Sequence, residues 1–224
     1  MHTKRRIHLV PALVSLALLV LARPGDSQAG PLDGFSVGPR ISSVGWGVEV
    51  SRDFTDFFTL RAGPTFMIFG FDSTLSGVDY ATDVEFINGF LIGDFHPLKN
   101  GLRISGGVFV GTNTVDFTAR PSGSVTIGGQ TFAPGAVGRL NGEIDLNTFA
   151  PYVGLGYSGG LFGVEHLAFD FELGMKYGGA PDVTLTSSGA VSQADLNSEE
   201  KKIENQIDFI RFYPVVTLGL SYRF

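Results

Sequence analysis

The sequence predicts an all-β protein: a transmembrane, antiparallel, up-and-down β-barrel of eight strands, with one short helix before the last strand. Residues 214–224, at the end of the chain, alternate apolar with small or polar side chains and stop on an aromatic ring. The apolar positions, which share one face of a strand, are Val216, Leu218, Leu220, Tyr222 and Phe224. A strand that is apolar on one face only suits a barrel wall between lipid and a lumen.

Composition points to the same fold class. The chain has 31 glycines, 20 phenylalanines and a positive mean hydropathy of +0.20. After residue 29, no apolar run reaches the roughly 20 residues that a membrane-spanning helix needs. Alternating strands account for this combination, because a barrel carries its apolar side chains on one face of its wall.

The first 29 residues have the pattern of a secretory signal peptide. Basic residues 4–6 precede an apolar run at 7–21, and small residues at 27–29 suit a cleavage site. A membrane anchor is the alternative, but His8 and Pro11 interrupt the run, which is shorter than a membrane span. We therefore expect a signal peptide at 1–29, cleavage near Ala29, and one barrel domain at 30–224 in the outer membrane.

The exported chain is acidic. The full sequence carries 16 Lys and Arg residues against 22 Asp and Glu residues, and cleavage would remove basic residues in excess of acids. This balance disfavours a nucleic-acid partner. The chain has no cysteine, so neither disulfides nor thiolate metal sites are expected, and no cofactor is predicted.

Alternating segments and turn signals give the strand order. The predicted strands cover residues 35–40, 44–53, 58–68, 84–95, 102–119, 151–157, 167–177 and 214–224. Short connections at 53–56, 97–101 and 158–165 alternate with long ones at 72–82, 120–141 and 178–210. Barrels with short periplasmic turns and long external loops have this rhythm. The short strand at 35–40 is included because the strand number must be even.

One segment near the end has helical spacing instead. Asn197 followed by Glu200 matches a capping box, and apolar residues recur at helical spacing from Leu196 to Ile210. We expect a helix of about 10–14 residues before the last strand. Two placements stay open: packed on the barrel rim, or inserted into the lumen as a plug.

Two motifs match catalytic signatures without their context. Residues 154–159 match G-x-G-x-x-G and residues 156–160 match G-x-S-x-G. Both signatures need a helix to open after the glycines, whereas another strand follows here. Small residues that ease a barrel turn explain the glycines instead. His96, Glu165 and His166 could share a metal in principle, but histidines at a membrane interface are the simpler interpretation.

Charged residues alternate with apolar residues along the predicted strands. A Lys or Arg facing lipid near the bilayer midplane costs roughly 2–4 kcal/mol, so these residues should face the lumen. An eight-stranded barrel is just wide enough for side chains to fill, so opposite charges should meet there and close it. A permeation path lined by the same charges is the alternative. The predicted network comprises Glu49, Arg61, Asp94, Arg103, Asp170, Glu172, Lys176 and Arg223.

The chain resembles the small outer-membrane β-barrels, the broad group of OmpA-type transmembrane domains and OmpW-like proteins. The resemblance lies in the signal peptide, the strand rhythm, the strand at 150–157 and the terminus at 222–224. It implies a monomer in contact with outer-membrane lipids and lipopolysaccharide, and it carries over no catalytic residues. It also implies a C-terminal signal for the barrel-assembly machinery, formed by Leu218, Leu220, Tyr222 and Phe224. Unlike OmpA, the chain has no periplasmic domain after the predicted barrel, so a cell-wall tether is not expected.

Two classes of function follow. The first is a non-enzymatic structural or surface-interaction barrel with a lumen plugged by charges. The second is a narrow channel for small or apolar solutes, as OmpW-like proteins are thought to be. A lipid-modifying enzyme would need a base near the outer leaflet, and the predicted turns place His96 and His166 at the other end.

Overall fold

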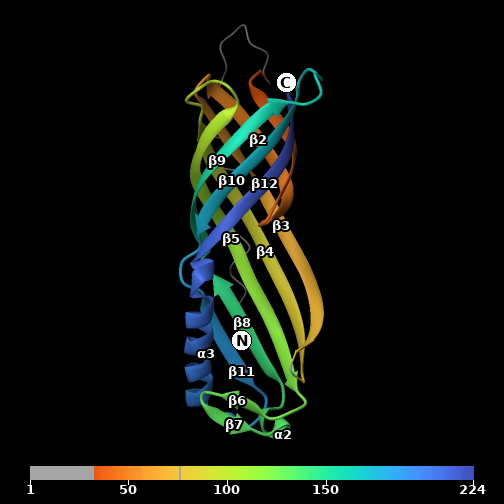
Figure 1. Ribbon diagram of the computed structural model, residues 1–224, viewed down its shortest axis with the longest axis vertical. Coiled ribbons are helices and arrows are strands. Elements are labelled where there is room, and N and C mark those ends of the chain that lie inside the picture. Colours follow the sequence, from red (N-terminus) through yellow and green to blue (C-terminus); the bar gives the residue numbers. More distant parts are fainter. Residues whose placement is uncertain (1–32, 76) are drawn as a thin grey trace.

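A computed structural model describes residues 33–75 and 77–224, and its main feature is a closed barrel of eight antiparallel strands (Figure 1). The barrel strands are β1 (Phe35–Ser42), β2 (Gly45–Thr55), β3 (Phe58–Leu75), β4 (Val78–Phe95), β5 (Leu102–Pro121), β9 (Phe149–Gly160), β10 (Leu167–Tyr177) and β12 (Phe212–Arg223). β1 pairs with β12 and β5 pairs with β9, which closes the barrel. The predicted fold class is confirmed, including the short first strand. The predicted signal peptide lies outside the described residues.

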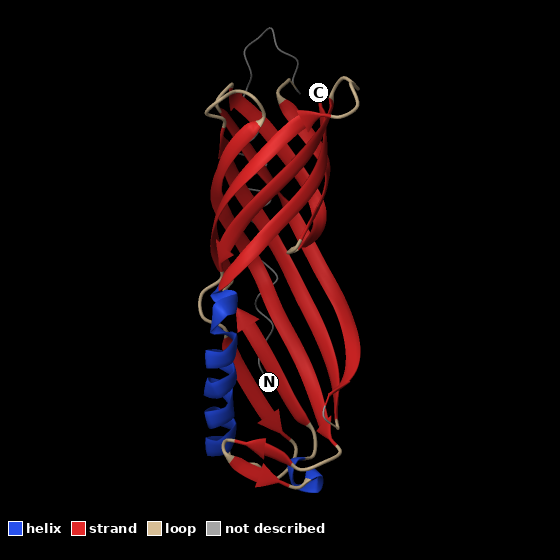
Figure 2. Ribbon diagram, in the orientation of Figure 1, coloured by secondary structure: helices blue, strands red, loops and turns tan. Residues whose placement is uncertain are grey.

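Three barrel strands continue beyond the barrel into a second structure. The distal halves of β3, β4 and β5 are joined by β8 (Leu140–Leu146) and β11 (Asp182–Ser187) in the order β11-β8-β5-β4-β3. We call this part the external sheet. β5 pairs with β9 through its first half and with β8 through its second half. Figure 2 shows these long strands running without a break from the barrel to the far end of the molecule.

The predicted loop at 72–82 is wrong, because β3 and β4 form one uninterrupted hairpin there. Their pairing runs from Phe58 opposite Phe95 to Leu75 opposite Val78. This part of the hairpin stands beyond the barrel, so its outer face is polar and the apolar contrast that marks a barrel strand is lost. Backbone hydrogen bonding between the two strands continues without that contrast.

The predicted helix exists as α3 (Gln193–Ile207), but it begins earlier and is longer than expected. Its N-cap is Ser192, whose hydroxyl accepts a hydrogen bond from the Asp195 amide at 3.2 Å. Asn197 therefore lies inside the helix and does not cap it. Ser192 is the cap, because its hydroxyl accepts a hydrogen bond from an unpaired amide of the first turn. A 3-10 turn, η1 (Asp208–Arg211), links α3 to β12.

The long segment between β5 and β8 also contains regular structure. It forms a small hairpin of β6 (Val125–Ile127) and β7 (Gln130–Phe132), followed by the short helix α2 (Pro134–Val137). These elements close the far end of the external sheet (Figure 1). The sequence predicted a loop here, since each element is too short to show a period.

α3 packs on the external sheet and lies outside the lumen. Leu196 is buried with Val183 and Leu185 of β11 in a core separate from that of the barrel. Glu204 and Glu200 accept hydrogen bonds from the Val183 and Leu185 amides at 3.2 and 2.7 Å. The helix thus covers the outer edge of β11, which would otherwise offer free backbone donors to another strand. Of the helices in the described ranges, none is long and apolar enough to cross a membrane.

Replacing Leu196 with alanine should loosen the external sheet without unfolding the barrel. The side chain is 4% exposed, and removing a buried leucine costs about 2–5 kcal/mol. We expect faster amide hydrogen exchange in β8 and β11, with unchanged heat-modifiable migration of the barrel on gels. Lys201→Ala, on the exposed face of the same helix, is the control. Equal exchange rates in parent and variant would show that α3 does not hold this sheet.

Candidate functional site

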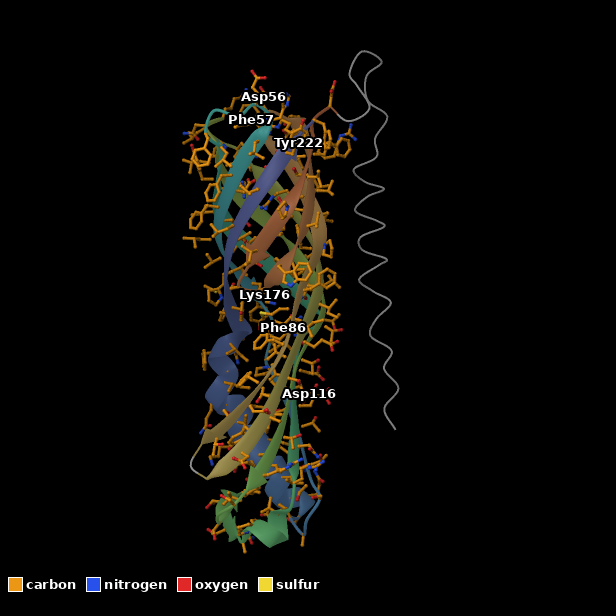
Figure 3. The ribbon with its side chains drawn as sticks, turned by 90° about the vertical axis from the view of Figure 1, so that its right-hand side faces the viewer. Asp56, Phe57, Phe86, Asp116, Lys176 and Tyr222 are labelled. Atoms are coloured by element: carbon orange, nitrogen blue, oxygen red, sulfur yellow. The ribbon has the colours of Figure 1, made fainter. Side chains whose placement is uncertain are left out.

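The lumen of the barrel is filled by side chains, many of them charged. Alternation along each strand turns these residues inward, while their neighbours in sequence face outward. The buried charged residues are Arg40, Arg61, Asp94, Arg103, Glu172 and Lys176. Figure 3 places Tyr222 and Asp56 at the end with the short turns, Lys176 at the junction with the external sheet, and Asp116 on that sheet.

Arg61 is bound on three sides by carboxylates. Its Nε and Nη2 donate to the two oxygens of Asp94 at 2.5 and 2.9 Å, a bidentate pair from β3 to β4. Nη2 also donates to Glu172 at 2.5 Å and Nη1 to Glu49 at 3.1 Å. The planar guanidinium suits this role, because its five donors lie in a fixed fork that matches carboxylate oxygens.

Glu172 of β10 lies at the centre of the cluster and is fully buried. One of its oxygens accepts from Arg61 and from Arg103 Nε, the latter at 3.1 Å. The other oxygen accepts from the Tyr152 hydroxyl at 2.6 Å. The Ser105 hydroxyl also donates to the first oxygen, at 3.0 Å. Four donors to one carboxylate favour its charged form in the absence of bulk water.

Two further arginines extend the cluster around the barrel. Arg103 donates to Asp170 at 2.9 Å and also to Ser158. Arg40 of β1 donates to Glu49 at 2.9 Å and to Thr217 of β12 at 3.1 Å. We call the whole cluster the ion-pair layer; its members are Arg40, Glu49, Arg61, Asp94, Arg103, Asp170 and Glu172.

An aromatic layer lies between the ion-pair layer and the external sheet. The Phe90 and Phe109 rings are 5.8 Å apart, and Tyr152 meets Phe109 edge-on at 5.4 Å. The same cluster contains Val44, Ala150, Ile92 and Val215. The Arg40 guanidinium lies 4.1 Å from the centre of the Phe90 ring, which joins the two layers.

Most of the predicted network residues come together, but two do not. Lys176 has no carboxylate within ion-pair distance in the described chain; its Nζ lies 3.5 Å from Asn113 Oδ1 and near three aromatic rings. The prediction that Arg223 belongs to the network is wrong, because its side chain is 63% exposed and pairs with Asp53 at 3.0 Å. Alternation gives the face of a strand but not the depth along it, and Arg223 lies at the rim of the lumen, where it lines the entrance cavity with Asp53.

Arg40 is the member that the sequence analysis missed. It alternates with Pro39 and Ile41, so the same reasoning that found Arg61 applies to it. The segment 35–40 is short and carries glycine and proline, so its alternation is weaker than that of the longer strands.

The glycine motifs of β9 make room for the cluster. β9 continues as a strand through residues 154–160, so no helix opens there. A Cβ on Gly154 would lie 2.4 Å from the Tyr152 hydroxyl, and a Cβ on Gly156 would lie 2.7 Å from Arg103 Nε. Neither distance is possible without displacing those side chains, so the glycines serve packing in the lumen.

The residues of the predicted assembly signal and the two histidines lie apart from the two layers. Leu218, Leu220, Tyr222 and Phe224 are exposed on the outward face of the barrel wall. His96 Nε2 lies 3.1 Å from Thr59 Oγ1, and the His166 ring lies 5.9 Å from Tyr222. Within residues 33–75 and 77–224, no three His, Asp or Glu side chains form a possible metal site.

The lumen contains two cavities of very different volume. A cavity of about 710 Å³ at the end with the short turns reaches in from Asp53 and Lys99 to Arg61 and Arg103. The void among the ion-pair layer itself, beside Arg40 and Glu49, measures only about 10 Å³. A void of that size is at the lower limit for a single water molecule. The entrance therefore ends at the ion-pair layer.

The fold of this chain is similar to that of two solved crystal structures. A crystal structure of Acinetobacter baumannii CarO matches with 24% identity and a TM-score of 0.61, over 84% of this chain and 97% of that one. A crystal structure of Acinetobacter baumannii CarO2 matches with 23% identity and a TM-score of 0.61, over 86% and 99%. No family model and no curated protein matches the sequence. The similarity establishes a shared barrel fold.

Glu172→Gln should destabilise the barrel strongly. The substitution keeps the shape but leaves Arg61 and Arg103 short of one buried negative charge, and breaking a buried pair costs about 3–5 kcal/mol. Equilibrium unfolding in urea of the barrel refolded into lipid measures the change. A stability equal to that of the parent would mean that water already enters the layer.

Asp56→Asn is the matched control for that experiment. Asp56 pairs with Lys99 in an exposed turn at 2.7 Å, and this hydrogen bond lowers the pKa of Asp56 below its ordinary value. Because the folded-state pKa is lowered, the pair stabilises the fold above the ordinary pKa and is lost as pH falls through the folded value. The pair is fully formed at neutral pH, yet solvent screens it, so its loss should change stability little.

Proposed function

We propose that the protein is an integral outer-membrane β-barrel, non-enzymatic, that acts as a structural or surface-interaction protein with a closed lumen. The observation that carries this proposal is the stack of an ion-pair layer and an aromatic layer across the whole lumen. A barrel of eight strands has no room for a water-filled path beside such side chains. What remains for interaction is the external sheet, which projects well beyond the barrel.

The membrane location rests on the outward face of the wall. Large apolar side chains are exposed there on every side, which water would not tolerate over such an area. Examples are Ile41, Trp46, Val153, Leu155 and Leu173, each at least half exposed. An apolar band of this kind fits lipid, and the predicted signal peptide and terminal Phe224 fit export and insertion by the barrel-assembly machinery. The proposed surroundings are outer-membrane lipids and lipopolysaccharide, with the protein as a monomer.

A narrow channel for small or apolar solutes is the second candidate. The cavity of about 710 Å³ favours it, because it already leads from one end of the barrel to Arg61 and Arg103. Conduction would then require movement of the ion-pair layer and of the aromatic layer together.

Conductance in a planar lipid bilayer separates the two candidates. We expect the refolded parent to conduct almost nothing. Arg103→Ala opens the ion-pair layer and Phe109→Ala opens the aromatic layer; since the layers lie in series, only the double variant should conduct well. Lys201→Ala on α3 is the control and should match the parent. Steady, ion-selective conductance by the parent would favour the channel.

A further inference from the structure

The outer face of the external sheet carries a charged hollow near its tip. The cavity measures about 520 Å³ and is lined by Asp72, Asp79, Thr118, Arg120 and Arg139 among others. Ligand pockets commonly have volumes of about 300–1,000 Å³. The hollow lies on the face opposite to α3, because Phe117 and Ala119, which alternate with Thr118 and Arg120, point into the core that α3 covers.

The two arginines lie just past the end of the β5–β8 pairing and both line the hollow. The last pair is Ala119 of β5 with Leu140 of β8; Arg120 follows Ala119, and Arg139 precedes Leu140 just outside β8. The Arg139 backbone is held there by Ser188, whose hydroxyl accepts from its amide at 2.8 Å and whose amide donates to its carbonyl at 2.9 Å. Like charges directly opposite on neighbouring strands destabilise a sheet. Both side chains are exposed, and an anion held between them would offset their mutual repulsion.

Neither arginine is neutralised by the part of the protein that the structure describes. Among the described residues, no carboxylate lies within ion-pair distance of Arg120 or Arg139. Neither guanidinium donates a hydrogen bond to another described residue. Asp79 of β4 is the direct cross-strand neighbour of Arg120 on β5, yet its carboxylate accepts a hydrogen bond from the Thr74 hydroxyl at 2.7 Å instead. The other arginines whose contacts are resolved all pair with an acid.

We propose that this hollow binds an acidic saccharide, with a carboxylate or phosphate group held between Arg120 and Arg139. Paired guanidinium forks are suited to a single planar or tetrahedral anion. Asp72 of β3 and Asp79 of β4, which also line the hollow, would accept hydrogen bonds from sugar hydroxyl groups. These two carboxylates also repel a polyanion, so a ligand that combines one anionic group with neutral hydroxyl groups fits best.

The inference rests on the proposed function in one respect, which is that this end of the barrel faces the outside of the cell. A saccharide there could be soluble, or it could be the acidic sugar of lipopolysaccharide in the membrane. Both sources present the same chemistry to Arg120 and Arg139, and the two arms of the experiment below separate them.

Calorimetric titration of the refolded full barrel in uncharged detergent tests the proposal. One arm uses a galacturonic acid trisaccharide, with a neutral galactose trisaccharide as its matched control. The other arm uses lipopolysaccharide micelles. We expect the acidic ligand of at least one arm to bind, and Arg120→Gln and Arg139→Gln each to weaken that binding about tenfold, equivalent to 1.4 kcal/mol. Lys201→Gln, which removes an exposed positive charge on α3, should leave it unchanged.

Several results would overturn the proposal: no binding in either arm, equal binding of the neutral trisaccharide, or unchanged affinity in both arginine variants. Inorganic phosphate serves as a competitor; displacement by phosphate alone at equal concentration would show a simple anion site and also overturn it. Circular dichroism and heat-modifiable migration confirm that the variants fold. Conductance is measured separately, so a conducting barrel that binds the saccharide refutes the closed lumen and leaves this inference standing.

Discussion

The burial of charge inside a narrow barrel is the constraint on which the rest of the structure depends. In a barrel that sits in lipid, as proposed, a charged side chain facing the bilayer midplane is costly, and the members of the ion-pair layer all turn inward. Eight strands enclose little more room than side chains fill, and the void beside Arg40 and Glu49 measures only about 10 Å³. Arg61 and Arg103 both bind Glu172, and with Glu49 and Asp94 the cluster draws on five strands: β2, β3, β4, β5 and β10.

The same constraint explains features that look unrelated in the sequence. Gly154 and Gly156 leave space for Tyr152 and Arg103, so the glycine motif is part of the packing around the charges. The aromatic layer excludes water from one side of the ion pairs, which strengthens them. β3, β4 and β5 extend through both layers and then form the external sheet, so the barrel gives that sheet a rigid base.

Much of the barrel could be predicted from the sequence, because a wall that is apolar outside and polar toward its lumen imposes a strict alternation. β10 and β12 show this alternation, and the structure pairs them from Leu167 to Tyr177 of β10. The external sheet could not be predicted in the same way, since water touches its outer face and the polar pattern of residues 72–82 resembles a loop. Alternation predicted the face of β12 that carries Arg223 but not its depth in the barrel. Arg40 was not predicted, because β1 is short and its alternation is weak. The hollow at Arg120 and Arg139 depends on pairing between β5 and β8, which are separated by an intervening hairpin and helix.

A double-mutant cycle between Arg61 and Glu172 tests the central claim most directly. Unfolding free energies would be measured for Arg61→Gln, Glu172→Gln and the double variant in the same lipid. If the two side chains form one buried unit without water, the effects should be strongly non-additive, with a coupling free energy of about 2–3 kcal/mol. Additive effects, within about 0.5 kcal/mol, would show that water separates the charges and that the lumen is not closed by the ion-pair layer.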